Sequence, residues 1–282
     1  LALIGSSYAV AAFPALSEAS ALVGRTEFTG ILSSSARHVI LWSVVSVGLI
    51  AVLRAHIVRV LLGTGAFDWN ATRLTAALLV VLAVGLIAQG LILLFSRALY
   101  AVRQSWRPLA YQLLGGALTI LLAIVFLSLP TAGFPTWLAV YLKVGDVHGT
   151  AILLIALAAT LGQIFLAILS LIALRSVSPG LAATLERPLI DGSLAALVGG
   201  IATYFTLVLE GGIAPLTTLL SVFTQGFLAG IVGLCVAGLT LFFVENKEFL
   251  IVADALSRLV RLPMNRKTAL APSAEEPIQP LT

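Results

Sequence analysis

Uncharged apolar runs alternate along the chain with short stretches that carry charge and proline. The longest run has no charged residue between Arg73 and Arg97. As a helix rising about 1.5 Å per residue it covers roughly 34 Å, enough to cross a hydrocarbon core of about 30 Å. Two glycines just upstream disfavour helix there, so we expect Thr72 or Asn70 to cap a spanning helix over 73–100.

The other apolar runs predict five more spanning helices and half of another. Residues 1–16 are too short to span alone and have the pattern of the last half of a span, which Pro14 is expected to break. Residues 17–36 are predicted to form a polar linker. The remaining complete spans are expected over residues 37–53, 108–129, 150–174, 193–209 and about 217–244.

The segments outside the spans have the composition of membrane surfaces or solvated tails. The first complete span is expected to run on obliquely to Leu62 as an interfacial helix. Residues 130–149, with two prolines, Trp and Tyr, predict an interfacial loop. Residues 248–262 predict an amphipathic surface helix, and the proline-rich tail from Pro263 is expected to be disordered.

Composition agrees with a multi-pass membrane protein rather than a soluble globule. Hydrophobic residues make up 60% of the chain and charged residues 10%, and the mean hydropathy is +1.11. The net charge of +4 does not indicate nucleic-acid binding, because the cations lie in short loops between apolar runs. The single cysteine, Cys235, allows no disulfide framework within the chain. The first residue is Leu, within an apolar run, so we expect the chain to be part of a longer polypeptide.

The distribution of Lys and Arg predicts which loops face the cytoplasm. If the segment 17–36 is cytoplasmic, the same side receives the loops around 97–107 and 175–192 and the C-terminal tail. That side then holds twelve of the sixteen Lys and Arg residues, and the opposite side holds four. The positive-inside rule therefore predicts a cytoplasmic C-terminus.

Polar and small residues recur on one face of four predicted helices at helical spacing. Such stripes fit a shared, wettable lumen between helices, and they fit equally the hydrogen bonds and close packing that join membrane helices. The sequence leaves both interpretations open. The four stripes are Gly85, Gln89, Ser96, Tyr100 and Arg103; Ser35, His38, Trp42 and Ser46; Gln112, Gly115 or Gly116, and Thr119; and Thr160, Gln163, Ala167 and Ser170.

Two arginines near membrane depth are the candidate cations of such a lumen. Arg37 and Arg97 must each reach water, pair with an anion or face a cavity, because a cation facing lipid is costly. They fit either an anion-attracting cavity mouth or ordinary cytoplasmic anchors. His38 fits either a proton-titrating group or an interfacial residue. The helices over 108–129 and 150–174 contain no Asp or Glu, so neither carries a carboxylate cation site.

Sequence motifs do not indicate enzymatic chemistry. The chain has no His/Cys cluster, no Walker loop, no G-x-S-x-G and no paired acidic residues in an apolar span, so we expect neither an enzyme nor a metal or cofactor site. Close helix packing is indicated instead, because small residues at small-xxx-small spacing let helices approach. Gly226, Gly230 and Gly233 of the last span are expected to pack against Gly199 and Gly200.

Four motifs occur in an order and spacing typical of one family. Residues 13–17 (FPALS) match an F/L-P-x-L-S helix end, and residues 57–68 (IVRVLLGTGAFD) match an I-V-x-L-L-F-x-x-G-x-F-x segment. Residues 97–108 (RALYAVRQSWRP) match an R/G-x-F-Y-A-x-x-D-x-x-T-P loop, and residues 147–149 (VHG) match the H-V/A-G that opens a later helix. Together they resemble the MurJ (MviN) lipid II flippases. The resemblance covers residues 1–174, and the last two spans by count and placement only.

The resemblance implies an all-α, multi-pass membrane helix bundle that is the C-terminal lobe of a fourteen-helix, MATE-like exporter of the multidrug/oligosaccharidyl-lipid/polysaccharide superfamily. The chain would run from the end of helix eight to helix fourteen, and its partner would be the N-terminal lobe of the same polypeptide. Residues 1–174 would belong to the transport lobe, 175–246 would form two additional helices, and 247–282 the cytoplasmic helix and tail.

The family moves peptidoglycan precursor linked to undecaprenyl pyrophosphate across the bacterial inner membrane by alternating access, with the lipid tail in a groove that the last two helices help to form. This function implies a substrate path lined by side chains of the transport lobe. The path is predicted to include Arg37, Gln89, Ser96, Arg97 and Tyr100. Arg97 or Arg37 would attract the anionic head group.

The sequence departs from the family pattern in three respects. Gln104-Ser105 stands where the family has an Asp and a small residue, and the helix over 37–53 lacks a proline common there. The family's cavity arginines lie mostly in the part upstream of this chain. Two alternatives therefore stay open: a flippase for O-antigen or another polysaccharide lipid, or a drug exporter, of the same fold; and a non-transporting membrane scaffold.

Overall fold

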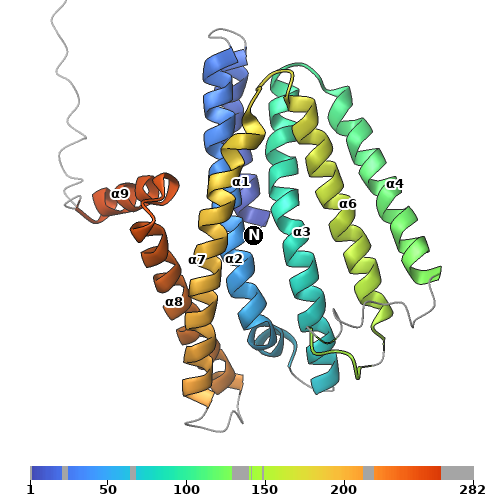
Figure 1. Ribbon diagram of the computed structural model, residues 1–282, viewed down its shortest axis with the longest axis vertical. Coiled ribbons are helices and arrows are strands. Elements are labelled where there is room, and N and C mark those ends of the chain that lie inside the picture. Colours follow the sequence, from blue (N-terminus) through green and yellow to red (C-terminus); the bar gives the residue numbers. More distant parts are fainter. Residues whose placement is uncertain are drawn as a thin grey trace, which may run out of the picture.

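The computed structural model describes residues 2–20, 25–63, 68–128, 140, 142–147, 149–211 and 219–261. Within these ranges the regular secondary structure is entirely helical, which confirms the all-α prediction. In chain order the helices (Figure 1) are α1 (Ala2–Glu18), α2 (Arg25–Leu62), α3 (Trp69–Ala101), α4 (Trp106–Ser128), α6 (Ala151–Leu174), α7 (Leu181–Gly211), α8 (Leu219–Phe243) and α9 (Lys247–Arg261).

Six of the described helices are long and apolar enough to cross a membrane, namely α2, α3, α4, α6, α7 and α8. The prediction of a multi-pass bundle with six complete spans is therefore confirmed. The amphipathic helix predicted over 248–262 is α9, displaced by one residue. The aromatic anchors expected at Trp137 and Tyr141, and the tail from Pro263, lie outside the described residues.

Two boundaries near the N-terminus differ from the prediction. Helix α1 is not broken at Pro14 but runs through it to Glu18. The proline ring lies on an exposed side of the helix, where the lost backbone hydrogen bond is tolerated. The polar linker predicted over 17–36 is also wrong, because its second half is the first part of α2. There Phe28 and Leu32 lie four residues apart and are buried, so this stretch is an amphipathic helix packed into the core.

The start of α3 differs from the prediction in its cap. Asp68, rather than Thr72 or Asn70, is the N-cap, and its Oδ1 accepts a 2.7 Å hydrogen bond from the backbone N–H of Ala71. The hydroxyl of Thr72 instead donates to the carbonyl of Asp68 at 3.0 Å. An Asp just outside the helix reaches an amide that has no partner within the first turn, which is the usual work of a cap.

Helix α7 is longer than the predicted span over 193–209. Its first part contains Pro188 and several charged residues, a composition that resembles a loop. The structure nevertheless makes this part helical, because Leu181 and Leu185 enter the same buried cluster as Leu99 of α3. Tertiary packing therefore overrides the local composition.

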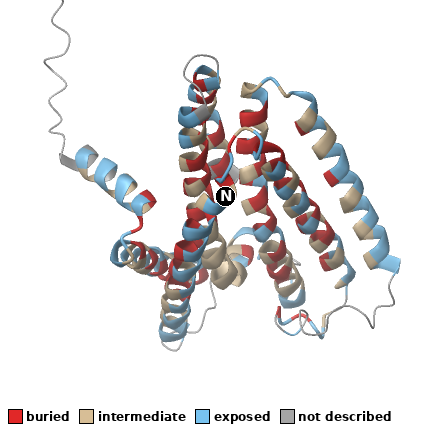
Figure 2. Cartoon of the chain, turned by 45° about the horizontal axis from the view of Figure 1, so that its top comes forward, coloured by how far each residue is buried: buried red, intermediate tan, exposed pale blue. Residues whose placement is uncertain are grey.

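Helix α2 runs through the middle of the bundle and separates two groups of helices (Figure 1). Helices α1, α3, α6 and α4 lie on one side, and α7, α8 and α9 lie on the other. The largest buried cluster draws side chains from α1, α2, α3, α6 and α7. Helix α4 packs chiefly on α6 and leaves most of its surface exposed (Figure 2).

Candidate transport path

Four of the five predicted path residues lie on the same helix, α3, and they form a partly open face. Gln89 and Tyr100 are exposed, Tyr100 to 45%. Ser96 and Arg97 are half-buried. The three side chains of Gln89, Ser96 and Tyr100 follow i, i+7, i+11 spacing, which places them along one stripe of the helix. The structure therefore brings these four residues together as an open polar face on an otherwise apolar helix.

Arg97 is held at this face by an aromatic ring from the neighbouring helix. Its guanidinium carbon lies 5.3 Å from the ring centroid of Phe13 in α1. A cation over an aromatic face is stabilised by the ring quadrupole and still leaves the guanidinium donors available. The contact thus orients a positive charge without neutralising it.

Helix α1 is part of the site because small residues bring it close to α3. A Cβ added to Gly5 would overlap the Cα of Gly90 in α3. Ala9 and Ala12 continue the same side of α1 and are buried. Sequence reasoning missed this contact, although Gly5, Ala9 and Ala12 have the small-residue spacing of a close helix pair.

Arg37, the fifth predicted path residue, lies on α2 and is paired with a different part of the molecule. Its Nε is 2.8 Å from Oε1 of Glu248 in α9, although the contact lacks hydrogen-bond geometry. The Glu248 side chain is only 8% exposed and that of Arg37 is 36% exposed. This arginine therefore compensates a buried carboxylate, and it is not part of the α3 face.

His38, predicted to be either titrating or interfacial, is buried. Its Nδ1 lies 2.9 Å from the carbonyl oxygen of Ser34. Because a carbonyl can only accept, Nδ1 carries the proton. The imidazole ring lies against Tyr8 of α1 in a tilted arrangement, with 5.4 Å between the ring centroids. The side chain thus joins α1 to α2.

Two threonines of the polar stripes on α4 and α6 serve packing. Thr160 donates from Oγ1 to the carbonyl of Val81 in α3 at 2.9 Å. A Cβ on Gly85 would lie 3.3 Å from the same hydroxyl oxygen, so α3 and α6 are in close contact there. Thr119 of α4 donates within its own helix to Gly115, which faces α6. For these residues the packing interpretation describes the observed contacts.

An apolar groove runs between α2 and α7 and has a volume of about 800 Å³. Its floor is made of small residues, because Gly48 of α2 approaches Ala196 of α7 so closely that a Cβ would clash. Aromatic and aliphatic side chains form its sides, among them Tyr204 and Phe205. The groove offers a long apolar surface on two spanning helices.

Polar side chains also join α2 to α7 and α8 at the end remote from α9. Gln225 of α8 donates from Nε2 to the carbonyl of Leu207 in α7 at 3.0 Å, which fixes the orientation of its amide. Its Oε1 then faces Nε2 of His56 in α2 at 3.2 Å. Since Oε1 only accepts, Nε2 of His56 must donate. The sequence analysis placed the segment that contains His56 at the membrane–water interface, and it did not single out Gln225.

A short clamp joins the start of α3 to the loop before α6. Arg73 contacts both carboxylate oxygens of Asp146 at 2.6 and 2.8 Å and also donates to the carbonyl of Lys143. The side-chain hydrogen bond from Arg73 lowers the pKa of Asp146 below its usual value. The clamp fixes the loop before α6 against α3.

Comparison with known proteins gives one match. The sequence model of the family described as Lipid II flippase MurJ matches residues 1–185. The comparisons with curated proteins and with solved structures gave no match. The matched region includes α1 to α6 and the start of α7, and therefore the whole polar face of α3. Helices α8 and α9 lie beyond it. Within the described residues there is no group of His, Cys, Asp and Glu that could hold a metal ion.

Proposed function

Because the chain belongs to the MurJ lipid II flippase family, we propose that it is the C-terminal lobe of a flippase that moves lipid-linked peptidoglycan precursor across the bacterial inner membrane by alternating access. The observation that carries this proposal is the open polar face of α3. Gln89 lies near the middle of a spanning helix and is exposed. A polar side chain at that depth is unfavourable against lipid, so this face belongs against a water-filled cavity or an opposing lobe.

In this proposal Arg97 is the cation of the path. The pyrophosphate that links sugar to lipid is an anion, and a guanidinium offers it charge and paired donors. Phe13 holds Arg97 without neutralising it, whereas Arg37 is balanced by Glu248. We therefore assign the attraction of the head group to Arg97 and not to Arg37. Ser96 and Tyr100 flank it and supply hydroxyl groups.

The groove between α2 and α7 suits the lipid tail. It is apolar, it lies on two spanning helices, and its volume of about 800 Å³ accommodates a long hydrocarbon chain. Hydrocarbon would lie there against carbon on both sides while the charged head group stays at α3. In alternating access this lobe would move against the upstream lobe, with the C-terminus on the cytoplasmic side.

The test uses the full-length protein in cells that depend on it for growth. We expect Arg97→Gln to reduce flipping at least tenfold, because loss of one charge-assisted contact costs more than about 1.4 kcal/mol. Depletion rescued with this variant should accumulate lipid-linked precursor on the cytoplasmic side. Arg175→Gln is the matched control, since Arg175 is an exposed cation at the end of α6 and does not belong to α3. Unchanged flipping by Arg97→Gln at equal expression would contradict the assigned role.

A further inference from the structure

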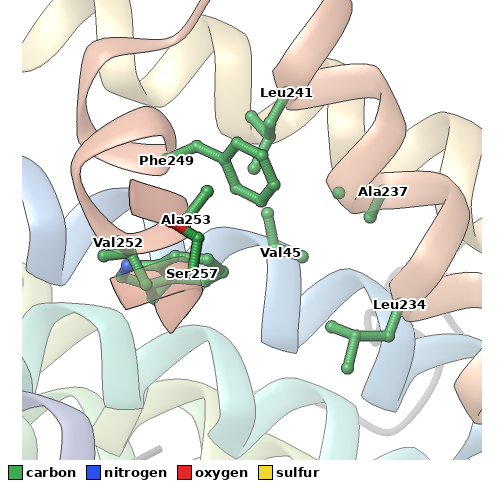
Figure 3. A pocket seen from close by; sticks show the side chains of 10 residues that line it. Val45, Leu234, Ala237, Leu241, Phe249, Val252, Ala253 and Ser257 are labelled. Carbon is green, nitrogen blue, oxygen red and sulfur yellow. The ribbon is translucent and has the colours of Figure 1, made fainter. Parts of the chain in front are cut away.

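A second cavity lies under the amphipathic helix α9, on the other side of α2 from the transport face. Its volume is about 590 Å³ and its walls come from α2, α8 and α9 (Figure 3). Phe249 of α9 extends toward Val45 and Leu241, and Leu234 lies farther along α8 (Figure 3). The wall is almost entirely carbon, and its polar side chains are Trp42 and Ser257.

The start of α9 is fixed by its backbone. Glu245 adopts a left-handed conformation (φ 53°). The N–H of Asn246 returns to the carbonyl of Leu241 at 3.0 Å, which closes the end of α8. The side chain of Asn246 then caps α9 by accepting from the N–H of Phe249 at 3.0 Å. Helix α9 therefore leaves α8 in one defined direction.

Two buried side chains tie the same point to the rest of the bundle. Asn246 Nδ2 donates to Oδ2 of Asp191 in α7 at 2.8 Å, and both residues are buried. Glu248 forms its ion pair with Arg37 of α2. These ties fall within the first two residues of α9 and the residue before it. The remainder of α9 projects over the cavity and is anchored to the bundle through its first turn.

The position of the cavity indicates what fills it. Helices α2 and α8 cross the membrane, and the cavity lies where α8 ends and the amphipathic helix begins. Water is poorly held in a space with so few polar partners, whereas lipid chains are the surrounding medium at this depth. Since a water-sized group takes about 30 Å³, the cavity has room for about 20 such groups, which suits one hydrocarbon chain.

We propose that this cavity is a binding site for one acyl chain of a membrane phospholipid, with α9 as its lid. The exposed side chain of Lys247 at the start of α9 complements the phosphate of such a lipid. Most of the residues that line the site belong to α8 and α9, beyond the region matched to the family, and Trp42 and Val45 of α2 complete its wall. The proposal does not depend on the flipping of lipid II.

The test uses full-length protein in lipid nanodiscs that contain phosphatidylglycerol with a photoreactive diazirine at the end of one acyl chain. We expect labelled peptides from α8, α9 and the middle of α2. Ala253→Trp fills the cavity and should reduce this labelling at least fivefold. Ala255→Trp is the matched control, because the same substitution two residues away lies on the exposed side of α9. Equal labelling in wild type and Ala253→Trp would overturn the proposal.

A second variant tests the lid, and a third separates this proposal from the transport function. Glu248→Gln removes the ion pair, and we expect faster hydrogen exchange across α9 together with reduced labelling. Arg97→Gln should lose flipping but keep labelling. Recovery of polyprenyl phosphate instead of phospholipid from the labelled site would also overturn the proposal, because the cavity would then hold the substrate tail. Thermal unfolding of each variant in detergent confirms that it is folded.

Discussion

Polar side chains on the open face of α3 and those between α7, α8 and α9 have opposite roles. On the α3 face, Gln89 and Tyr100 are exposed and the guanidinium of Arg97 lies over the ring of Phe13. On the α7, α8 and α9 side, Asp191 and Gln225 are buried and bonded across helices. The first arrangement leaves polar groups available to something outside this chain, whereas the second uses them to hold helices together. Substitutions on the two sides should therefore affect different properties.

The largest effect on stability is expected in the seam between α7 and α8. A Cβ on Gly199 would lie 2.7 Å from the carbonyl oxygen of Gly233 and 2.9 Å from the Cβ of Ala237. The backbone of two packed helices yields little, so Gly199→Leu should destabilise the protein by about 3 kcal/mol. The measurement is unfolding of the full-length protein in mixed micelles. Gly116→Leu on α4 is the control, because open space surrounds Gly116. Equal losses of stability in both variants would contradict the close packing of α7 on α8.

A smaller effect is expected when the tie between α7 and α9 is cut. Asp191→Ala leaves the buried amide of Asn246 without its acceptor, which should cost about 2 kcal/mol. Asp191→Asn keeps an oxygen that can accept the same hydrogen bond, so its loss should be clearly smaller. The two variants are compared by the same unfolding assay and by hydrogen exchange in α9. A larger loss in Asp191→Asn than in Asp191→Ala would rule out this hydrogen bond as the stabilising contact.

On the open face the expected stability change is within about 0.5 kcal/mol. Gln89→Leu removes an exposed polar group and no packing contact, so the unfolding midpoint should stay nearly constant. Flipping by the full-length protein should nevertheless fall several-fold, because the proposed path loses a polar group. Precursor accumulation on depletion measures it. A large drop in stability without loss of flipping would reverse the assignment of the two sides.

The smallest effect is expected at the exposed clamp between Arg73 and Asp146. The hydrogen bond from Arg73 lowers the pKa of Asp146, so the folded state favours the ionised carboxylate. A lowered pKa gives stability that is present above the carboxyl's ordinary pKa near 3.9 and is lost as pH falls through the lowered value. Amides of residues 142–147 should therefore exchange faster below that range. Asp146→Asn should remove the pH dependence; if it persists, another group is responsible.

Local sequence patterns predicted most of the fold. Hydrophobic length predicted six spans, and small-residue spacing predicted the contact of Gly199 with Gly233. The same prediction was wrong for Gly226, Gly230 and Gly200, which face α2 instead. The linker over 17–36 was predicted wrongly because polar residues masked the buried positions Phe28 and Leu32. Helix α7 was predicted too short because Pro188 disfavours a helix in the local sequence, whereas tertiary packing keeps this segment helical.

The sequence predicted which residues of α3 belong to the candidate site, but it did not predict which residues the two arginines contact. Residues of the α3 face could be grouped because they lie on one helix and recur at helical spacing. Arg37 and Arg97 looked equivalent, since both lie near membrane depth. The structure separates them through Glu248, 211 positions along the chain from Arg37, and through Phe13. A local pattern contains no information about such distant partners.

By itself the sequence determined that this chain is a bundle of spanning helices and that its motifs resemble one flippase family, because hydropathy and motif spacing are local properties of the chain. Only the tertiary structure decided which polar groups are open and which are paired. The bonds between His56 and Gln225 and between Asn246 and Asp191 join residues 169 and 55 positions apart. Their formation depends on how α2, α7 and α8 pack, and the free energy of a buried polar group depends on whether its partner arrives.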